Sequence, residues 1–132
     1  MIRHQDWPTR LVEYIEQSRT VPFAYGSHDC CQFAAKAVAA LTGENPAAAW
    51  HYTNEIGAAR LIVEAGGLEA LITTAMGEPI HPSQAGRGDV VLADLELGPT
   101  IGVCLGRTCA FATDPVGVVF RPRAAARMAW RV

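Results

Sequence analysis

The segment from residue 25 to residue 33 reads YGSHDCCQF, and it decides the fold that the sequence predicts. Asp29 is a favourable N-cap residue, and Gln32 follows it three positions later as in a capping box, so a helix is expected to begin here. Cys30 then falls in the first turn of that helix. The unpaired N–H groups and the positive helix end at this position favour a thiolate, so Cys30 is a candidate nucleophile.

Four helices are expected in the first part of the chain. The helix that begins at Asp29 carries an apolar stripe at helical spacing, formed by Phe33, Ala37 and Leu41, and Gly43 ends it. Helical spacing and end signals predict three further helices: one capped by Asp6 that ends before Pro22, one from about Glu55 to Glu64, and one from about Leu68 to Met76.

Short apolar runs separated by Gly, Pro and Asp follow in the second part of the chain. They predict strands at residues 89–93, 101–105, 109–112 and 117–120, with 129–132 as a last edge strand. Helices followed by strands are typical of an α+β domain. We therefore expect one domain over residues 1–132, with N-terminal helices packed on a C-terminal antiparallel β-meander or partial barrel.

Composition narrows the classes of function. Half of the 132 residues are hydrophobic and the formal net charge is −2, which predicts a globular protein without a bias toward nucleic acid. No apolar run approaches the roughly 20 residues of a membrane-spanning helix, and the first residues lack the apolar stretch of a signal peptide. Synthesis and initial residence in a cytoplasm are therefore expected.

The four cysteines do not predict a metal centre. They are Cys30, Cys31, Cys104 and Cys109, and none of them forms the short C-x-x-C spacing of zinc and iron–sulfur sites. A reducing compartment would keep all four as thiols. We expect neither a metal ion nor a cofactor.

Three motifs occur in the order found in a known family. They are DCCQF at residues 29–33, RGDVV at 87–91 and TIGVCLG at 100–106. In this order they resemble the NlpC/P60 peptidases, a papain-like family of cysteine peptidases, and the resemblance covers roughly residues 22–120. It implies a papain-like domain with Cys30 as nucleophile, a histidine as its base and a third polar residue that orients the imidazole.

The resemblance fails at the two positions that would complete the catalytic machinery. Thr100 stands where the family has its catalytic histidine, and the third polar position falls near Ala112. A threonine cannot act as a general base at neutral pH, so Cys30 is interpreted as a vestigial nucleophile or a small buried hydrophobic residue. Substitute bases remain open, and the candidates are His28, His51 and His81. Asp89 is a further candidate, although a Gly-Asp pair at a strand start more often fixes a turn.

Five short segments spread over the chain carry a second resemblance: HDC at residues 28–30, GGL at 66–68, RGDVV at 87–91, GVC at 102–104 and AWRV at 129–132. With them the whole chain resembles a family encoded in tail gene clusters of phages and prophages. That resemblance implies a structural or assembly component of a tail tip, made in the host bacterial cytoplasm and then carried in the virion tail. Its partners would be other tail-tip proteins, with peptidoglycan as a further candidate and no nucleic acid or membrane span. The alternatives are an active cysteine hydrolase of peptidoglycan peptides and a small-ligand or acyl-group binding domain.

Overall fold

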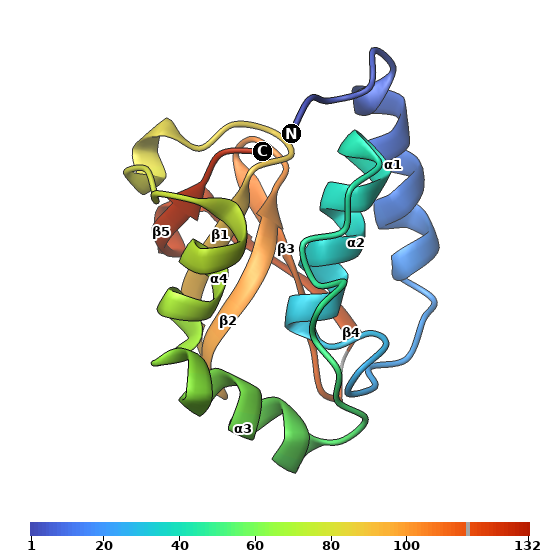
Figure 1. Cartoon of the computed structure of the whole chain (residues 1–132). Coiled ribbons are helices and arrows are strands. Elements are labelled where there is room, and N and C mark those ends of the chain that lie inside the picture. Colours follow the sequence, from blue (N-terminus) through green and yellow to red (C-terminus); the bar gives the residue numbers. More distant parts are fainter. Residues whose placement is uncertain (116) are drawn as a thin grey trace.

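The computed structural model describes residues 1–115 and 117–132 and has an α+β architecture (Figure 1). Four α-helices precede a five-stranded antiparallel sheet, as the order of sequence patterns predicts. The helices are α1 (Trp7–Ser18), α2 (Cys30–Thr42), α3 (Glu55–Ala65) and α4 (Leu68–Met76). The strands are β1 (Val90–Leu95), β2 (Gly98–Cys104), β3 (Thr108–Thr113), β4 (Gly117–Pro122) and β5 (Ala126–Trp130).

The sheet is a meander with one return. Its strand order is β4-β3-β2-β1-β5, so the first four strands follow one another and β5 crosses back to pair with β1. The predicted last edge strand is confirmed, although it begins three residues earlier than expected. Thr100 on β2 pairs with Ala93 on β1, which places Thr100 within the regular ladder rather than in a loop.

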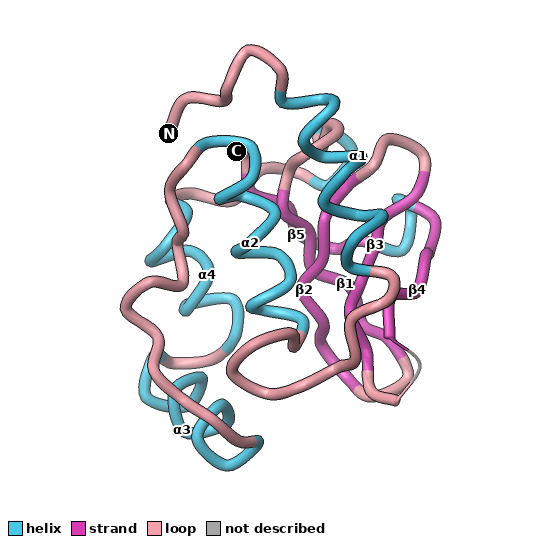
Figure 2. The backbone as a smooth tube through the Cα atoms, turned by 90° about the vertical axis from the view of Figure 1, so that its right-hand side faces the viewer, coloured by secondary structure: helices cyan, strands magenta, loops and turns pink. Residues whose placement is uncertain are grey.

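Helix α2 forms the middle layer of the domain. It contacts β2 and β3 on one side and α1 on the other, an arrangement that is visible in Figure 1 and, from the side, in Figure 2. The predicted stripe is correct, because Phe33, Ala37 and Leu41 are all fully buried. They pack with Leu11 of α1 and Trp130 of β5 into the main hydrophobic core. The start of α2 is therefore held in a fixed position above the sheet.

Two helix starts that looked alike in the sequence differ in the structure. Asp29 caps α2, and its Oδ1 accepts a hydrogen bond from Gln32 N at 2.9 Å. Asp6 precedes α1 but makes no side-chain cap, so that prediction is wrong. The Asp6 carboxylate instead accepts a hydrogen bond from Arg10 Nε at 2.8 Å, one turn along the helix. The Asp6 carboxylate therefore pairs with the exposed Arg10 side chain instead of with the backbone N–H groups at the start of α1.

Helix α3 lies apart from the core. None of its residues, all of which are described, is buried, and its main contact is with α4 (Figure 1). Ile56 and Val63 leave most of their side chains in solvent. Helix α3 therefore leaves apolar side chains uncovered by the rest of the described chain, and exposed apolar surface can mark an interaction site.

Candidate functional site

A cleft of about 390 Å³ opens where the start of α2 faces β2 and β3. The loop before α2, the loop between α2 and α3, and helices α3 and α4 complete its walls. The described residues that line it are Phe23, Tyr25, Asp29, Cys30, Cys31, Trp50, Tyr52, Glu55, Ala58, Leu61, Ile62, Leu68, Leu71, Leu97, Pro99, Thr100, Ala112, Thr113 and Asp114. Cys30, Thr100 and Ala112 therefore line the same cleft. These are the positions at which the resemblance would place the nucleophile, its histidine base and the third polar residue.

Asp29 organises the floor of the cleft. Besides capping α2 through Oδ1, it accepts hydrogen bonds at Oδ2 from Gly26 N at 2.9 Å and from the Tyr52 hydroxyl at 2.7 Å. Burial, together with the hydrogen bond to the Asp29 carboxylate, raises the pKa of Tyr52, so this hydroxyl stays protonated and remains a donor. A single buried carboxylate therefore joins the loops that precede and follow α2.

Gly26 permits the two loops to approach each other. Its φ of +88° lies in the left-handed region, and a Cβ atom at this position would lie 2.4 Å from the Tyr52 carbonyl oxygen. Any side chain would therefore separate the loops. The glycine within the YGSHD segment thus serves the cleft as well as the turn.

Cys30 is the first residue of α2, and its thiol is partly exposed in the cleft. Although partly exposed, the residue also packs against the main hydrophobic core. A hydrogen bond from the Cys31 thiol lowers the pKa of Cys30, burial opposes this, and the Ile101 backbone adds to the lowering. The same thiol pair raises the pKa of Cys31, which is buried in the core as expected. Cys30 can thus ionise before its neighbour.

None of the three candidate histidines lines the cleft, as far as the described residues define it. His28 is only 4% exposed, packs edge-on against the Phe33 ring, and its Nε2 has no hydrogen-bond partner among the described residues. His51 is exposed, and so is His81, whose Nδ1 contacts Ser83 Oγ at 2.7 Å. In the part of the chain that the structure describes, no imidazole therefore shares the cleft with Cys30.

Thr100 and Ala112 occupy the places that their sequence positions predicted. Both line the cleft, from β2 and β3 respectively. The Thr100 hydroxyl donates a hydrogen bond to Gly98 O at 3.0 Å, so its proton is committed to its own strand. Neither side chain can accept the proton of a thiol at neutral pH.

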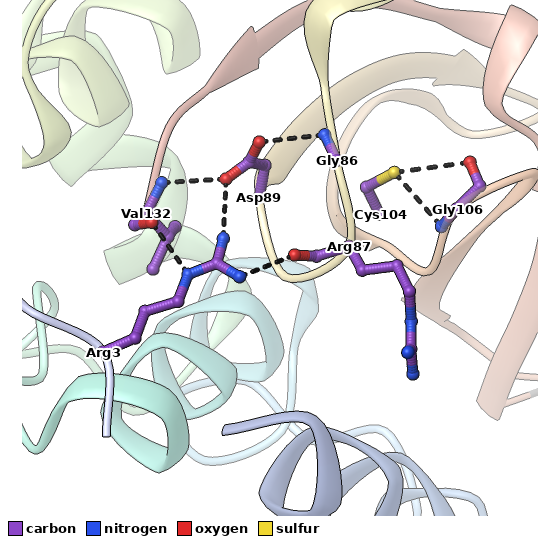
Figure 3. A network of polar contacts seen from close by, with 7 residues as sticks. All are labelled: Arg3, Gly86, Arg87, Asp89, Cys104, Gly106 and Val132. Atoms are coloured by element: carbon purple, nitrogen blue, oxygen red, sulfur yellow. Dashed lines mark hydrogen bonds and ion pairs between the residues drawn. The ribbon is translucent and has the colours of Figure 1, made fainter. Parts of the chain in front are cut away.

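Asp89 is a structural residue outside this cleft. Its carboxylate accepts hydrogen bonds from Arg3 Nη2, Val132 N and Gly86 N, each at 2.9 Å (Figure 3). The bond from Gly86 closes the turn before β1, as the Gly-Asp pattern predicts. The other two bonds join residues from opposite ends of the sequence.

A second pair of cysteines lies on the sheet. Cys104 on β2 and Cys109 on β3 are cross-strand neighbours, and both are fully buried. A hydrogen bond from the Cys109 thiol lowers the pKa of Cys104, and Gly106 N lies 3.4 Å from Cys104 Sγ (Figure 3). Both thiols are enclosed by protein, so they have no access to a substrate.

Several residues of the cleft were missed by reasoning from the sequence. The aromatic walls are Phe23, Tyr25, Trp50 and Tyr52, and the acidic residues at the mouth are Glu55 and Asp114. The sequence did contain a signal for the aromatic walls, because Trp50 and Tyr52 flank His51 in the loop expected between the second and third helices. Aromatic residues in a loop need a packing partner or a ligand, and this pair finds the cleft.

A family model describes nearly the whole chain. Residues 2–132 match the family described as a domain of unknown function (DUF6950). The chain belongs to this family. No curated protein matches the sequence. Within the described residues, no helix is long and apolar enough to cross a membrane, and no three side chains of His, Cys, Asp or Glu gather as metal ligands would.

Proposed function

We propose that this DUF6950 chain is a structural or assembly component of a tailed-phage tail tip. It would be built on an NlpC/P60-like, papain-like scaffold that has lost its hydrolytic activity. The observation that carries the proposal is the composition of the cleft. Cys30, Thr100 and Ala112 all line it, and these are the positions to which the resemblance assigns the nucleophile, the base and the third polar residue, whereas no described imidazole lines it.

The remaining polar groups of the cleft are poor substitutes for a histidine. A general base for a thiol works best when its pKa lies near the working pH, and a carboxylate with a pKa of roughly 4 is far too weak a base. Asp29 has in addition three hydrogen-bond donors on its two oxygens. Since a nucleophile and its base act as a unit, Cys30 alone retains little of the catalytic advantage.

Exposed apolar residues support a docking role. Leu97 lines the cleft from the β1–β2 turn and is 78% exposed. Helix α3, other residues of which line the cleft, also presents Ile56 and Val63 to solvent. Exposed apolar side chains at a concave site can mark a surface that another protein covers. In a tail tip, the neighbouring tail-tip proteins would cover this surface, and peptidoglycan would not be cleaved.

The competing function is a cysteine hydrolase of peptidoglycan peptides that uses His28, His51 or His81 as its base. It would need a rearrangement that brings one of these rings into the cleft. For His28 this means leaving its buried contact with Phe33. Purified chain incubated with peptidoglycan stem peptides separates the two functions, because the proposed function predicts no cleavage above the level of Cys30→Ser.

Location in the particle is tested separately. In virions purified from a phage that encodes this chain, mass spectrometry should detect it in the tail fraction. Virions carrying Cys30→Ser should assemble in the same yield as wild type. Cleavage of stem peptides that Cys30→Ser abolishes, or absence of the chain from virions, would contradict the proposed function.

A further inference from the structure

We propose that the cleft binds the side chain of a lysine or arginine that a partner polypeptide presents. The inference rests on the proposed function, because it names the kind of partner that would dock at the same site. Three properties of the cleft carry it: its charge, its aromatic walls and the exposed apolar residue at its mouth.

The charged side chains that line the cleft are all acidic, as far as the described residues define it. Asp29, Glu55 and Asp114 line it, and among the described lining residues there is no Lys, Arg or His. Asp29 is buried at the floor, whereas Glu55 and Asp114 are exposed at the mouth. The three residues come from separate parts of the chain, so the fold has brought their carboxylates around one opening. Opposite charge is what such a surface accepts.

The Tyr25 side chain lies close to all three carboxylates, which affects its pKa. Burial raises its pKa most, and Glu55, Asp114, Cys30 and Asp29 each raise it further through their negative charge. The ring of Tyr25 meets Phe23 edge-on, with centroids 5.1 Å apart. An aromatic face within a negative field favours a cation, since cation–π attraction and the carboxylates act together.

The cleft is large enough to hold the side chain of a lysine or arginine. Its volume of about 390 Å³ is at the lower end of the range of roughly 300–1,000 Å³ that is usual for ligand sites. Trp50 and Tyr52 add aromatic surface along which the aliphatic stem of a lysine or arginine can lie. The charged end would then lie in the combined negative field of Asp29, Glu55 and Asp114.

Leu97 indicates that the occupant belongs to a polypeptide. This side chain lines the cleft while 78% of it remains exposed. A small free cation would leave Leu97 in water, whereas the residues that flank a docked basic side chain can cover it. Burial of such apolar area is the usual source of binding free energy at protein interfaces.

The probe is a blocked peptide of sequence Ala-Leu-Ala-Lys-Ala-Leu-Ala, compared with peptides in which norleucine or glutamate replaces the lysine. Binding to the full chain is measured by isothermal titration calorimetry and by backbone amide shifts. The lysine peptide should bind at least about tenfold more tightly than the norleucine peptide, a difference of about 1.4 kcal/mol. The glutamate peptide should not bind. Added salt should lower the affinity for the lysine peptide, because the carboxylates at the mouth of the cleft are exposed and salt screens them.

Variants of the chain assign the binding to the cleft. Glu55→Gln combined with Asp114→Asn should remove the preference for lysine over norleucine. Glu64→Gln is the matched control, because Glu64 is an exposed acid on the same helix that does not line the cleft, and it should change nothing. Leu97→Ser should lower the affinity for the lysine peptide. It should leave unchanged the affinity for n-butylammonium, which carries the charged end of a lysine side chain without a polypeptide.

Three outcomes would overturn the inference. These are equal affinities for the lysine and norleucine peptides, no shift of any cleft residue at millimolar peptide, and n-butylammonium binding as tightly as the peptide. None of them bears on hydrolysis. The stem-peptide assay and the virion analysis therefore still test the proposed function if the peptide experiment fails.

Discussion

At the residue scale, Asp29 shows how one side chain can serve both the fold and the site. Its two oxygens hold the start of α2, the turn at Gly26 and the hydroxyl of Tyr52. The cap was predictable because its donor lies three residues away. The Tyr52 bond was not, because it spans 23 residues and depends on the path of an intervening loop. Local hydrogen bonds can be inferred from spacing, whereas distant ones require the tertiary structure.

Asp29→Ala should lower the free energy of unfolding by roughly 1.5–5 kcal/mol. Loss of an N-cap contributes about 0.5–2 kcal/mol, and roughly 1–3 kcal/mol is added if one of its two other donors, the Tyr52 hydroxyl or the Gly26 N–H, stays buried without a partner. Asp6→Ala is the control, because that carboxylate is exposed and makes no cap, and it should change the free energy of unfolding far less than Asp29→Ala does. Urea denaturation measures both, and equal effects would show that the cap and the Tyr52 bond contribute nothing.

His28 predicts a pH dependence of stability. Burial lowers its pKa below the ordinary value of about 6.5, and the nearby Lys36 lowers it further. The unfolded chain therefore binds a proton at a higher pH than the folded chain does. The contribution of neutral His28 is complete above about pH 6.5 and decreases as the pH falls from there toward the lowered folded-state pKa.

His28→Phe keeps a ring against Phe33 and removes the buried Nε2. The decrease in unfolding free energy between pH 6.5 and 5 should become smaller in this variant than in wild type. His51→Ala should leave the slope unchanged, because His51 is exposed. Identical slopes in wild type and His28→Phe, measured by urea denaturation across this range, would rule out titration of His28 in the buried state.

At the element scale, α2 was the most predictable part of the chain. Its cap, its apolar stripe and its terminal Gly43, which has φ +82°, are all encoded within the helix and its flanks. The bounds of α4 agree with the prediction, and those of α3 differ by one residue. What could not be predicted is that α3 lies outside the core, because helical spacing shows an apolar face without showing what covers it.

The stripe of α2 gives a stability prediction. Phe33→Ala and Leu41→Ala should each destabilise the chain by roughly 2–5 kcal/mol, because both side chains are fully buried and their removal leaves a cavity. Val63→Ala on α3 is the control, and it should cost less than about 0.5 kcal/mol because that side chain is 76% exposed. Thermal midpoints of the two core variants within a degree of wild type would contradict the observed packing of α2.

At the scale of the whole molecule, β5 and the Asp89 cluster join distant parts of the chain. The sequence predicted the edge strand but not its place beside β1, since strand order depends on contacts far apart in the sequence. Arg3 extends this connection, with Nε donating to Val132 O at 2.9 Å and Nη1 to Arg87 O at 2.8 Å. Its guanidinium also lies 4.3 Å from the centroid of the Trp7 ring. The cluster therefore fastens the segment before α1 to the sheet.

Asp89→Ala should destabilise the whole domain by roughly 3–5 kcal/mol, because it leaves a partly buried guanidinium and two backbone N–H groups without their acceptor. Asp94→Ala removes the exposed ion pair with Arg127 and should destabilise the domain far less than Asp89→Ala does, because solvent screens exposed ion pairs. Both values follow from chemical denaturation. A smaller loss for Asp89→Ala than for Asp94→Ala would contradict the structural role of the cluster.

Cys30 shares its cleft with no imidazole of the described residues, and the pH profile of its alkylation tests this most directly. Iodoacetamide labelling of Cys30 is followed by mass spectrometry, with Cys30→Ser giving the background from the buried cysteines. We predict one rise, at a pH below that of an ordinary thiol because Cys31 donates to Cys30, and unchanged by His28→Phe, His51→Ala or His81→Ala. A reactive plateau that persists below about pH 6 and disappears in one histidine variant would reveal a thiolate–imidazolium pair and contradict the account.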